Sequence, residues 1–503
     1  MPKKKFYITT AIPYVNAPPH IGHALEFVQA DVVARWHRLK GENVFFLTGT
    51  DENAQKNVLA AADKNTSPQK LVEANSLLFN DLLKTLNISN DDFIRTSVDK
   101  LHRAGAIKIW NACQKSGDVY KKSYAGLYCI GCEAFITEKE LVDGKCSEHL
   151  KAPEQISEEN YFFRLSKYER VLKELIVSDK LKIVPESRKN EMLSFIDAGL
   201  EDFSVSRPAE RMHGWGIPIP DDKSQIMYVW FDALTNYITA LGFAKNSAKF
   251  KKYWPADVHV IGKGITRFHA IYWPAMLLSA GVELPKSLFV HGYVTVNGQK
   301  ISKSLGNVVD PIVVAKKFGV DAVRYFLLKQ VSPFNDSDFS DAALVEATNA
   351  DLADGVGNLL QRTCVMLQKY FGGVIPKPDK FTEKDNALVR AVSIFDEVDT
   401  LIHKYEWNWA AERIIEAVHQ CNKYVAETEP WKIDDKKRLA TVLYVLIESL
   451  RIFSILLAPF IPFAAEKISV QLGQKNVLFK CVSFRKTTKG KIRSPEILFQ
   501  KIK

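Results

Sequence analysis

The opening of the chain alternates short apolar runs with one amphipathic stretch. Residues 6–10 and 44–48 are apolar runs of strand length, whereas residues 23–40 between them repeat with helical spacing and end at Gly41. A strand, a helix and a second strand in this order indicate parallel pairing, because the helix carries the chain back across the sheet. We therefore expect an α/β fold with a doubly wound, Rossmann-type parallel sheet.

The strand pattern is interrupted in the middle of the chain and then returns. From about residue 119 to residue 208 the sequence is rich in cysteine, tyrosine and charge. Strand-like apolar runs reappear at residues 227–230, 258–261 and 288–290. This order predicts an insertion between two halves of one sheet domain.

Helical periodicity takes over beyond about residue 338. The helical stretches are residues 342–370, 383–404, 408–427 and 436–457. The most apolar part, residues 442–463, contains Glu448, Arg451, Pro459 and Pro462, which favours a buried helix of a bundle over a membrane span. The basic tail from residue 480 onward still carries apolar side chains, and we expect it to pack back on the body.

Composition narrows the class of protein without deciding it. The chain has 503 residues, with 47% hydrophobic and 25% charged residues, as in an ordinary globular enzyme of several domains. Its net charge of +10 suits a polyanionic partner such as RNA but does not require one. Seven cysteines without a disulfide pattern, and a start without a signal-peptide core, predict a cytoplasmic protein with no membrane segment.

A candidate phosphate site follows the first expected strand. His20-Ile21-Gly22-His23 opens the first helix, where backbone N–H groups and the helix dipole attract anions. Gly22 allows a nucleotide to approach the backbone, and His20 and His23 can donate to phosphate oxygens. Taken alone, the two histidines could equally form a metal site or an ordinary surface.

A second candidate lies far downstream. Residues 298–307 form a glycine-bounded loop that carries Lys300 and Lys303. Mobile ammonium groups can follow negative charge that develops on a leaving pyrophosphate. A solvated basic loop is the alternative, and the presence of the histidine motif in the same chain weighs against it.

The expected insertion contains a metal-ligand pattern. Cys129-x2-Cys132 and Cys146-x2-His149 are two chelating pairs that match the four ligands of a structural Zn²⁺. Because four protein ligands close the coordination sphere, such an ion would be structural rather than catalytic. Free cysteines are the alternative, as we expect for Cys113, Cys364 and Cys421 on helix-like stretches.

The histidine segment and the lysine segment together resemble the two signatures of the class I aminoacyl-tRNA synthetases. His20-Ile21-Gly22-His23 matches the first, and Lys300-Ile301-Ser302-Lys303-Ser304 matches the second, with Ile301 where Met is usual. Residues 9–16, 47–53, 228–233 and 268–275 narrow the resemblance to the methionine-specific family, and the likeness extends over essentially the whole chain.

The resemblance implies a set of site residues for ATP, L-methionine and tRNA(Met). Those implied for catalysis and ATP are His20, Gly22, His23, Lys300 and Lys303. Those implied for methionine are Ala11, Ile12, Tyr14, Asp51, Trp230, Ala233, Tyr237, Ile265 and His269, with Asp51 facing the ammonium and Tyr14 or His269 polarising the sulfur. Those implied for the anticodon are Asn358, Arg362 and Trp431. Gly264 departs from the family, where many relatives carry Asp, so a ribose contact must come from elsewhere.

The resemblance also implies a reaction and a division of the chain. Methionine attacks ATP, pyrophosphate leaves, and the methionyl group passes from the adenylate to tRNA, with Mg²⁺ arriving on ATP. The expected units are the first half of the Rossmann domain (1–118), a connective insertion with a zinc knuckle (119–208), the second half (209–300), the lysine loop and stem-contact region (301–340), and a helical anticodon-binding domain with its tail (341–503). We expect a monomer.

Three alternatives remain open from the sequence. A nucleotidyltransferase shares the histidine motif but has no use for the zinc insertion and the helical bundle. A non-catalytic RNA-binding protein would not need His20, His23, Lys300 and Lys303 together. A cysteine-specific synthetase should place its metal at the amino-acid site, whereas the four ligands here cluster within the insertion.

Overall fold

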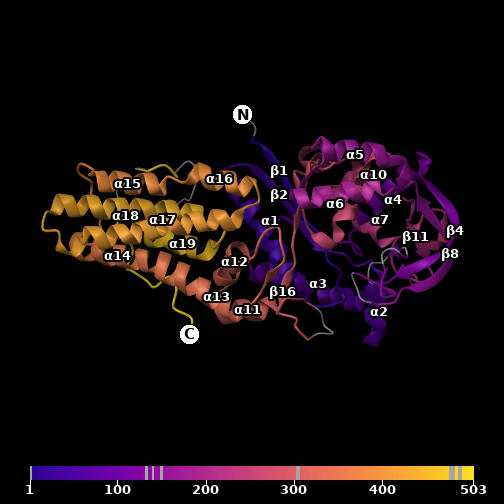
Figure 1. Cartoon of the computed structure of the whole chain (residues 1–503), viewed down its shortest axis with the longest axis horizontal. Coiled ribbons are helices and arrows are strands. Elements are labelled where there is room, and N and C mark those ends of the chain that lie inside the picture. Colours follow the sequence, from indigo (N-terminus) through magenta and orange to yellow (C-terminus); the bar gives the residue numbers. More distant parts are fainter. Residues whose placement is uncertain are drawn as a thin grey trace.

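The computed structural model of the chain consists of a sheet-containing body and an elongated helical body, which lie end to end (Figure 1). It describes residues 3–130, 134–136, 138, 141–147, 151–301, 306–474, 482–484 and 490–503. Cys132, His149 and Lys303 lie outside the described residues.

A parallel sheet of six strands forms the centre of the first body, with strand order β3-β2-β1-β14-β15-β9. Its strands are β1 (Lys5–Thr10), β2 (Asn43–Thr50), β3 (Asp92–Arg95), β9 (Lys182–Val184), β14 (Val258–Gly262) and β15 (Ser287–His291). Every pairing within the sheet is parallel. The chain order reverses between β1 and β14, and such a switch point at the carboxyl ends of the strands is where open α/β sheets bind ligands. The Rossmann-type sheet predicted from the sequence is thus confirmed.

The strands of this sheet are buried because helices pack on its faces. The helices of the first body are α1 (Ile21–Leu39), α2 (Gln55–Asp63), α3 (Pro68–Thr85), α4 (Lys100–Lys115), α5 (Glu169–Val177), α6 (Glu186–Asp197), α7 (Val229–Ala233), α8 (Asn236–Thr239), α9 (Ala248–Tyr253) and α10 (Trp273–Ser279). A π-helical turn, η5 (Phe268–Tyr272), precedes α10.

The middle of the chain adds antiparallel sheets at the far end of the first body (Figure 1). Their strands are β4 (Val119–Cys129), β5 (Ala134–Ile136), β8 (Glu154–Phe163) and β10 (Phe203–Ser204) in one sheet, β6 (Leu141–Val142) and β7 (Lys145–Cys146) in a second, and β11 (Ser206–Pro208), β12 (Pro218–Ile219) and β13 (Asp222–Met227) in a third. The central strand β9 also comes from the range that we expected to be inserted, and it pairs with β15.

Short elements lead from the sheet to the helical body. They are β16 (Val294–Val296), β17 (Gln299–Lys300), β18 (Ser337–Asp338), α11 (Pro311–Phe318) and α12 (Val320–Lys329). The helical body then comprises α13 (Asp341–Ala347), the π-helical η7 (Thr348–Gly357), α14 (Asn358–Phe371), α15 (Glu383–Val392), α16 (Phe395–His403), α17 (Trp407–Thr428), α18 (Lys436–Leu456) and α19 (Pro462–Gln471).

The helix α18 is the axis of the bundle. Within the described chain it is the one helix long and apolar enough to cross a membrane by length and composition, but its apolar window is entirely buried among the other helices. The prediction of a buried bundle helix in this stretch is confirmed. Glu448 and Arg451 pair with each other inside the bundle, with 3.0 Å between Oε2 and Nη2.

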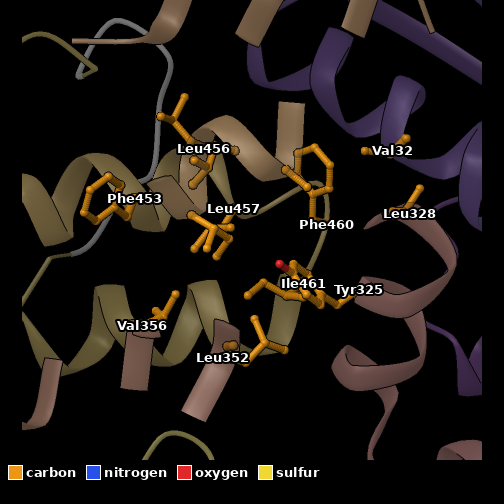
Figure 2. Packing of buried hydrophobic residues seen from close by; sticks show 14 of the residues in the cluster. Val32, Tyr325, Leu328, Leu352, Val356, Phe453, Leu456, Leu457, Phe460 and Ile461 are labelled. Atoms are coloured by element: carbon orange, nitrogen blue, oxygen red, sulfur yellow. The ribbon is translucent and has the colours of Figure 1, made fainter. Parts of the chain in front are cut away.

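Apolar side chains join the two bodies into one core. Val32 of α1 and Leu328 of α12 face Phe460 and Ile461, which lie in the turn between α18 and α19 (Figure 2). All four are buried. The helix that begins at the histidine motif is therefore packed directly against the helical body.

The strand expected at residues 227–230 is not formed, whereas the tail packs back on the body as expected. The predicted strand at residues 227–230 is wrong, because β13 ends at Met227 and α7 begins at Val229. An apolar run that is buried on all sides has no periodicity to separate strand from helix. In the tail, Leu498 and Phe499 pack against the core and the N–H of Ile502 donates to Oδ1 of Asn349 at 2.8 Å, as expected.

Candidate active site

The two motif histidines form the amino-terminal cap of α1. Nδ1 of His20 accepts from the N–H of Gly22 at 3.2 Å, and Nδ1 of His23 accepts from the N–H of His20 at 3.1 Å. The rings are stacked, with 3.9 Å between centroids. Because each Nδ1 is an acceptor, a neutral ring must carry its proton on Nε2. Both rings can therefore donate from Nε2 to a phosphate oxygen.

The charge of these rings follows from their surroundings. Burial lowers the pKa of His20 to about 4, and burial also places the pKa of His23 well below its ordinary value. The first turn of α1 contains no acidic residue, so the positive end of the helix dipole is not neutralised there. At neutral pH the motif offers uncharged N–H donors and a helix terminus that favours an anion.

A large cleft opens beside this cap, with a volume of about 1010 Å³. Its walls come from the segment after β1, the start of α1, α2, the carboxyl ends of β14 and β15 with the segments that follow them, and the end of β4. The motif residues His20, Gly22, His23 and Lys300 all line it. The two sequence motifs, far apart in the chain, thus meet across one cleft, while Lys303 lies outside the described residues.

A small second cavity of about 20 Å³ adjoins the cleft. It is lined by Ala11, Ile12, Trp230, Ala233, Leu234, Asn236, Tyr237, Ile265 and His269. Seven of these nine were implied for methionine by the sequence. The cavity has room for little more than one water molecule, so an amino-acid side chain must widen it.

The hydrogen bonds of His269 assign its tautomer. Nδ1 lies 2.9 Å from the carbonyl oxygen of Ile265 and must donate to it, so Nε2 accepts from the hydroxyl of Tyr237 at 2.7 Å. Burial lowers the pKa of His269 to about 4. In this arrangement the neutral ring has no further N–H for a thioether sulfur, which leaves the hydroxyl of Tyr14 as the better donor.

Aromatic rings and a π-helical turn form the wall of this cavity. Trp230 stacks on Phe268 with 3.9 Å between ring centroids, and the ring of His269 lies nearly perpendicular to it with 6.2 Å between centroids. Phe268 and His269 both belong to η5. The extra residue per turn of a π-helix re-aims the side chains, and such turns often mark functional sites.

Asp51 lies behind the cleft rather than in its wall. It is buried and forms a parallel bridge with Tyr14, which does line the cleft. The N–H of Asn53 reaches Oδ1 of Asp51 at 3.3 Å. The structure therefore places Asp51 next to the expected methionine residues, but its side chain is not among those lining either cavity.

A buried polar network that the sequence did not indicate supports α7. Asn53 donates to Oδ2 of Asp232 at 2.7 Å, and Nε2 of His102 lies 2.6 Å from Oδ1 of the same carboxylate. Because Trp230 and Ala233 belong to the same short helix, the network holds part of the second cavity in place. No periodic pattern links these residues, which come from three separate parts of the chain.

A second candidate site lies on the helical body. Arg362 of α14 is positioned over the indole of Trp431, with 5.6 Å from Cζ to the ring centroid. Trp431 is 46% exposed, unlike a core tryptophan, and Asn358 is exposed one turn before Arg362. The three residues implied for the anticodon therefore lie at the surface, Asn358 and Arg362 in α14 and Trp431 in the 3-10 turn η8 (Pro430–Lys432).

Two of the four expected zinc ligands are described. Cys129 in β4 and Cys146 in β7 are both buried in one small cluster with Ile136. Cys132 and His149 lie outside the described residues. Among the described residues no group of three or more potential ligands is found.

Family models match nearly the whole chain. A model described as tRNA synthetases class I (M) matches residues 6–155 and 139–364, and a model of the anticodon-binding domain of tRNA ligases matches residues 385–502. The fold, the cap of α1 and these matches define a class I tRNA synthetase.

Curated and solved relatives narrow the class. The methionine–tRNA ligase of Caldanaerobacter subterraneus subsp. tengcongensis is 47% identical over 99% of this chain and 79% of its own length. That of Brucella melitensis is 44% identical over 93% of this chain and 92% of its own. A structure of Mycobacterium tuberculosis methionyl-tRNA synthetase in complex with methionyl-adenylate has a TM-score of 0.95 at 41% identity, covering 99% of both chains. The chain belongs to the methionine–tRNA ligase family.

Proposed function

We propose that this chain catalyses the reaction of its family, joining methionine to tRNA at the expense of ATP with AMP and pyrophosphate as products. The observation that carries this function is the cleft that His20, His23 and Lys300 line together beside an aromatic cavity. A phosphate site next to an apolar pocket is what activation of methionine requires.

The triphosphate is assigned to the cap of α1 and the lysine loop. His20 and His23 donate from Nε2, the backbone at Gly22 allows close approach, and Lys300 with Lys303 balances the charge of the leaving pyrophosphate. Mg²⁺ accompanies ATP. Catalysis is mainly positioning and stabilisation of charge, since no covalent intermediate with the protein is needed.

Methionine is assigned to the small cavity and its rim. Ala11, Ile12, Trp230, Ala233, Tyr237, Ile265 and His269 surround the side chain. Tyr14 donates to the sulfur, and the carboxylate of Asp51, which lies behind the cleft in this structure, faces the ammonium when the cavity widens. The tautomer of His269 supports a role in which its ring, held by the hydroxyl of Tyr237, packs against the methionine side chain and does not donate to the sulfur.

A structural role is proposed for the insertion. One structural Zn²⁺ would be held by Cys129, Cys132, Cys146 and His149, and the shared burial of the two described thiols fits that group. It would stabilise the fold of the insertion.

Asn358, Arg362 and Trp431 are assigned to the anticodon of tRNA(Met), with Trp431 as a stacking platform. We further propose the five-part division of the chain given above, a monomer, and a cytoplasmic location.

Exchange of labelled pyrophosphate into ATP, measured for each amino acid in turn, tests the function. Methionine should support exchange far better than the other amino acids, cysteine included. The same preparation should then charge tRNA with methionine. Exchange without methionine dependence, or with another amino acid preferred, would overturn the proposal.

A further inference from the structure

In the wall of the cleft, the hydroxyl of Tyr293 lies where the Cβ atom of any other residue at position 264 would be. Gly264 follows β14 in the 3-10 turn η4 (Lys263–Ile265), and Tyr293 follows β15. A Cβ atom at Gly264 would lie 2.1 Å from the hydroxyl oxygen of Tyr293 and 3.5 Å from Cζ of the same ring. The position of the tyrosine hydroxyl is therefore compatible only with glycine at position 264.

The backbone of Tyr293 is held firmly in this position. Its N–H donates to Oδ1 of Asp336 at 2.9 Å, and its carbonyl oxygen accepts from the N–H of Ser337 at 3.0 Å. At the preceding Gly292, a Cβ atom would lie only 2.3 Å from the carbonyl carbon of Asn335. The close contact between the two segments prevents the main chain at Tyr293 from moving towards Asn335.

Two ammonium groups lie over the aromatic ring of Tyr293. Nζ of Lys263 lies 4.7 Å and Nζ of Lys300 lies 4.9 Å from the ring centroid of Tyr293. Lys263 also pairs with Oδ2 of Asp336 at 2.7 Å, so the ring and its backbone anchor belong to one network. Contacts of this kind contribute about 0.5–1 kcal/mol at exposed sites and so favour the position of the ring beside Gly264.

The position of Tyr293 relative to the switch point indicates what its hydroxyl meets. The cap of α1, after β1, is assigned to phosphates, and Ala11 and Ile12, which directly follow β1, line the methionine cavity. A nucleotide that spans the switch point must then place its nucleoside over the ends of β14 and β15, where Gly264 and Tyr293 line the cleft. A phenolic hydroxyl both donates and accepts, as a ribose hydroxyl does.

We propose that the hydroxyl of Tyr293 positions the ribose of ATP by a hydrogen bond to one of its hydroxyl groups, in the space that Gly264 leaves open. This inference rests on the proposed function and adds a positioning residue to it. Gly264 is then required for space rather than for flexibility, because its φ lies outside the left-handed region.

The test compares Tyr293→Phe with the wild-type chain in methionine-dependent pyrophosphate exchange, using ATP, 2′-deoxyATP and 3′-deoxyATP. We expect Tyr293→Phe to raise the KM for ATP roughly threefold to tenfold, the range for one neutral hydrogen bond. The KM for methionine should not change. The variant should also discriminate less than wild type against one of the two deoxy analogues, and that analogue identifies the hydroxyl concerned.

A double-mutant cycle with Gly264→Ala supplies the second arm. Gly264→Ala alone should raise the KM for ATP, because the new methyl group displaces the tyrosine hydroxyl. In the Tyr293→Phe background the same substitution should have little further effect, because the remaining Cζ contact of 3.5 Å is an ordinary one.

Unchanged discrimination between ATP and both deoxy analogues would overturn the proposal. So would additive effects in the cycle, or equal increases in the KM for ATP and for methionine, which a general structural role predicts. Wild-type chain that shows no methionine-dependent exchange would instead contradict the proposed function itself. The two failures are therefore distinguishable.

Discussion

Arg324 and Asp31 form an ion pair in which neither side chain is exposed, with 2.7 Å between Nη2 and Oδ2. Arg324 belongs to α12 and Asp31 to α1. Burial acts to raise the pKa of Asp31, but Arg324, Arg35 and two hydrogen bonds from Ser89 together outweigh it and hold that pKa below its ordinary value. The guanidinium also donates to the carbonyl oxygens of Pro459 and Phe460 at 2.8 and 3.0 Å. The pair thus links the helix of the phosphate site to the helical body.

We expect Arg324→Ala to lower the free energy of unfolding by about 3–5 kcal/mol, because it leaves the carboxylate of Asp31 in the interior without its main partner. Arg413→Ala is the matched control, since Arg413 pairs with Glu397 at a partly exposed site. That variant should lose no more than about 1 kcal/mol. Urea unfolding of both variants provides the measurement, and equal losses would show that the buried pair has no special role.

Lys303→Ala should slow adenylate formation about 10²–10³-fold, or ~2.7–4 kcal/mol, because its ammonium meets charge that develops only in the transition state. Binding of methionine should change far less. Rapid-quench measurement of the first step separates the two effects. An activation rate within a few fold of wild type would contradict the role.

The purified chain should contain one tightly held Zn²⁺, bound by Cys129, Cys132, Cys146 and His149. Its removal should disorder the insertion without removing a catalytic group, because none of the four ligands is among the residues assigned to catalysis. Elemental analysis with thiol titration before and after chelation measures both. Four freely titrating thiols and no metal in the untreated protein would exclude the site.

Trp431→Ala should weaken tRNA charging tenfold to a hundredfold, since stacking of a base on an aromatic ring is worth about 1–3 kcal/mol. Pyrophosphate exchange should hardly change, because methionine activation takes place in the other body. Trp409→Ala is the control. Trp409 is 60% exposed and lies near the start of α17, whereas Trp431 follows the end of that helix, so this substitution should leave both reactions intact. Equal losses in both reactions, with a lowered melting temperature, would make Trp431 a structural residue.

Acid should destabilise the chain partly through His269. Its pKa is about 4 when folded, whereas an unfolded histidine titrates near 6.5. As the pH falls from 6.5 towards 4, the unfolded chain gains a proton that the folded chain does not, so the free energy of unfolding falls. This contribution is about 3 kcal/mol and is complete above pH 6.5.

Denaturant unfolding at pH 7 and pH 4.5 tests this linkage. Wild type should lose about 2–3 kcal/mol more between the two values than His269→Gln, which has no imidazole to titrate. Parallel losses in the two proteins would mean that His269 is not held neutral by burial.

Local pattern was enough to locate most of the helices and the main strands. The apolar spacing of residues 436–457 predicted α18 (Lys436–Leu456) almost to the residue, and residues 6–10 predicted β1. The reason is that a helix or strand buried on one side repeats its apolar residues at the period of the element itself. The motif His20-Ile21-Gly22-His23 likewise carried its own chemistry, because a helix start needs only neighbouring residues to form an anion site.

Other features were decided only by the tertiary structure. Membership of β9 in the central sheet depends on its pairing with β15, and the π-helical turn at His269 depends on how that segment packs. Arg324 and the carbonyl of Leu86 are 238 residues apart and meet inside the core. Contacts between distant segments leave no period in either segment. The sequence by itself therefore determined the elements and the class of chemistry, whereas the fold decided that Tyr293 stands over Gly264, because two loops after different strands meet there.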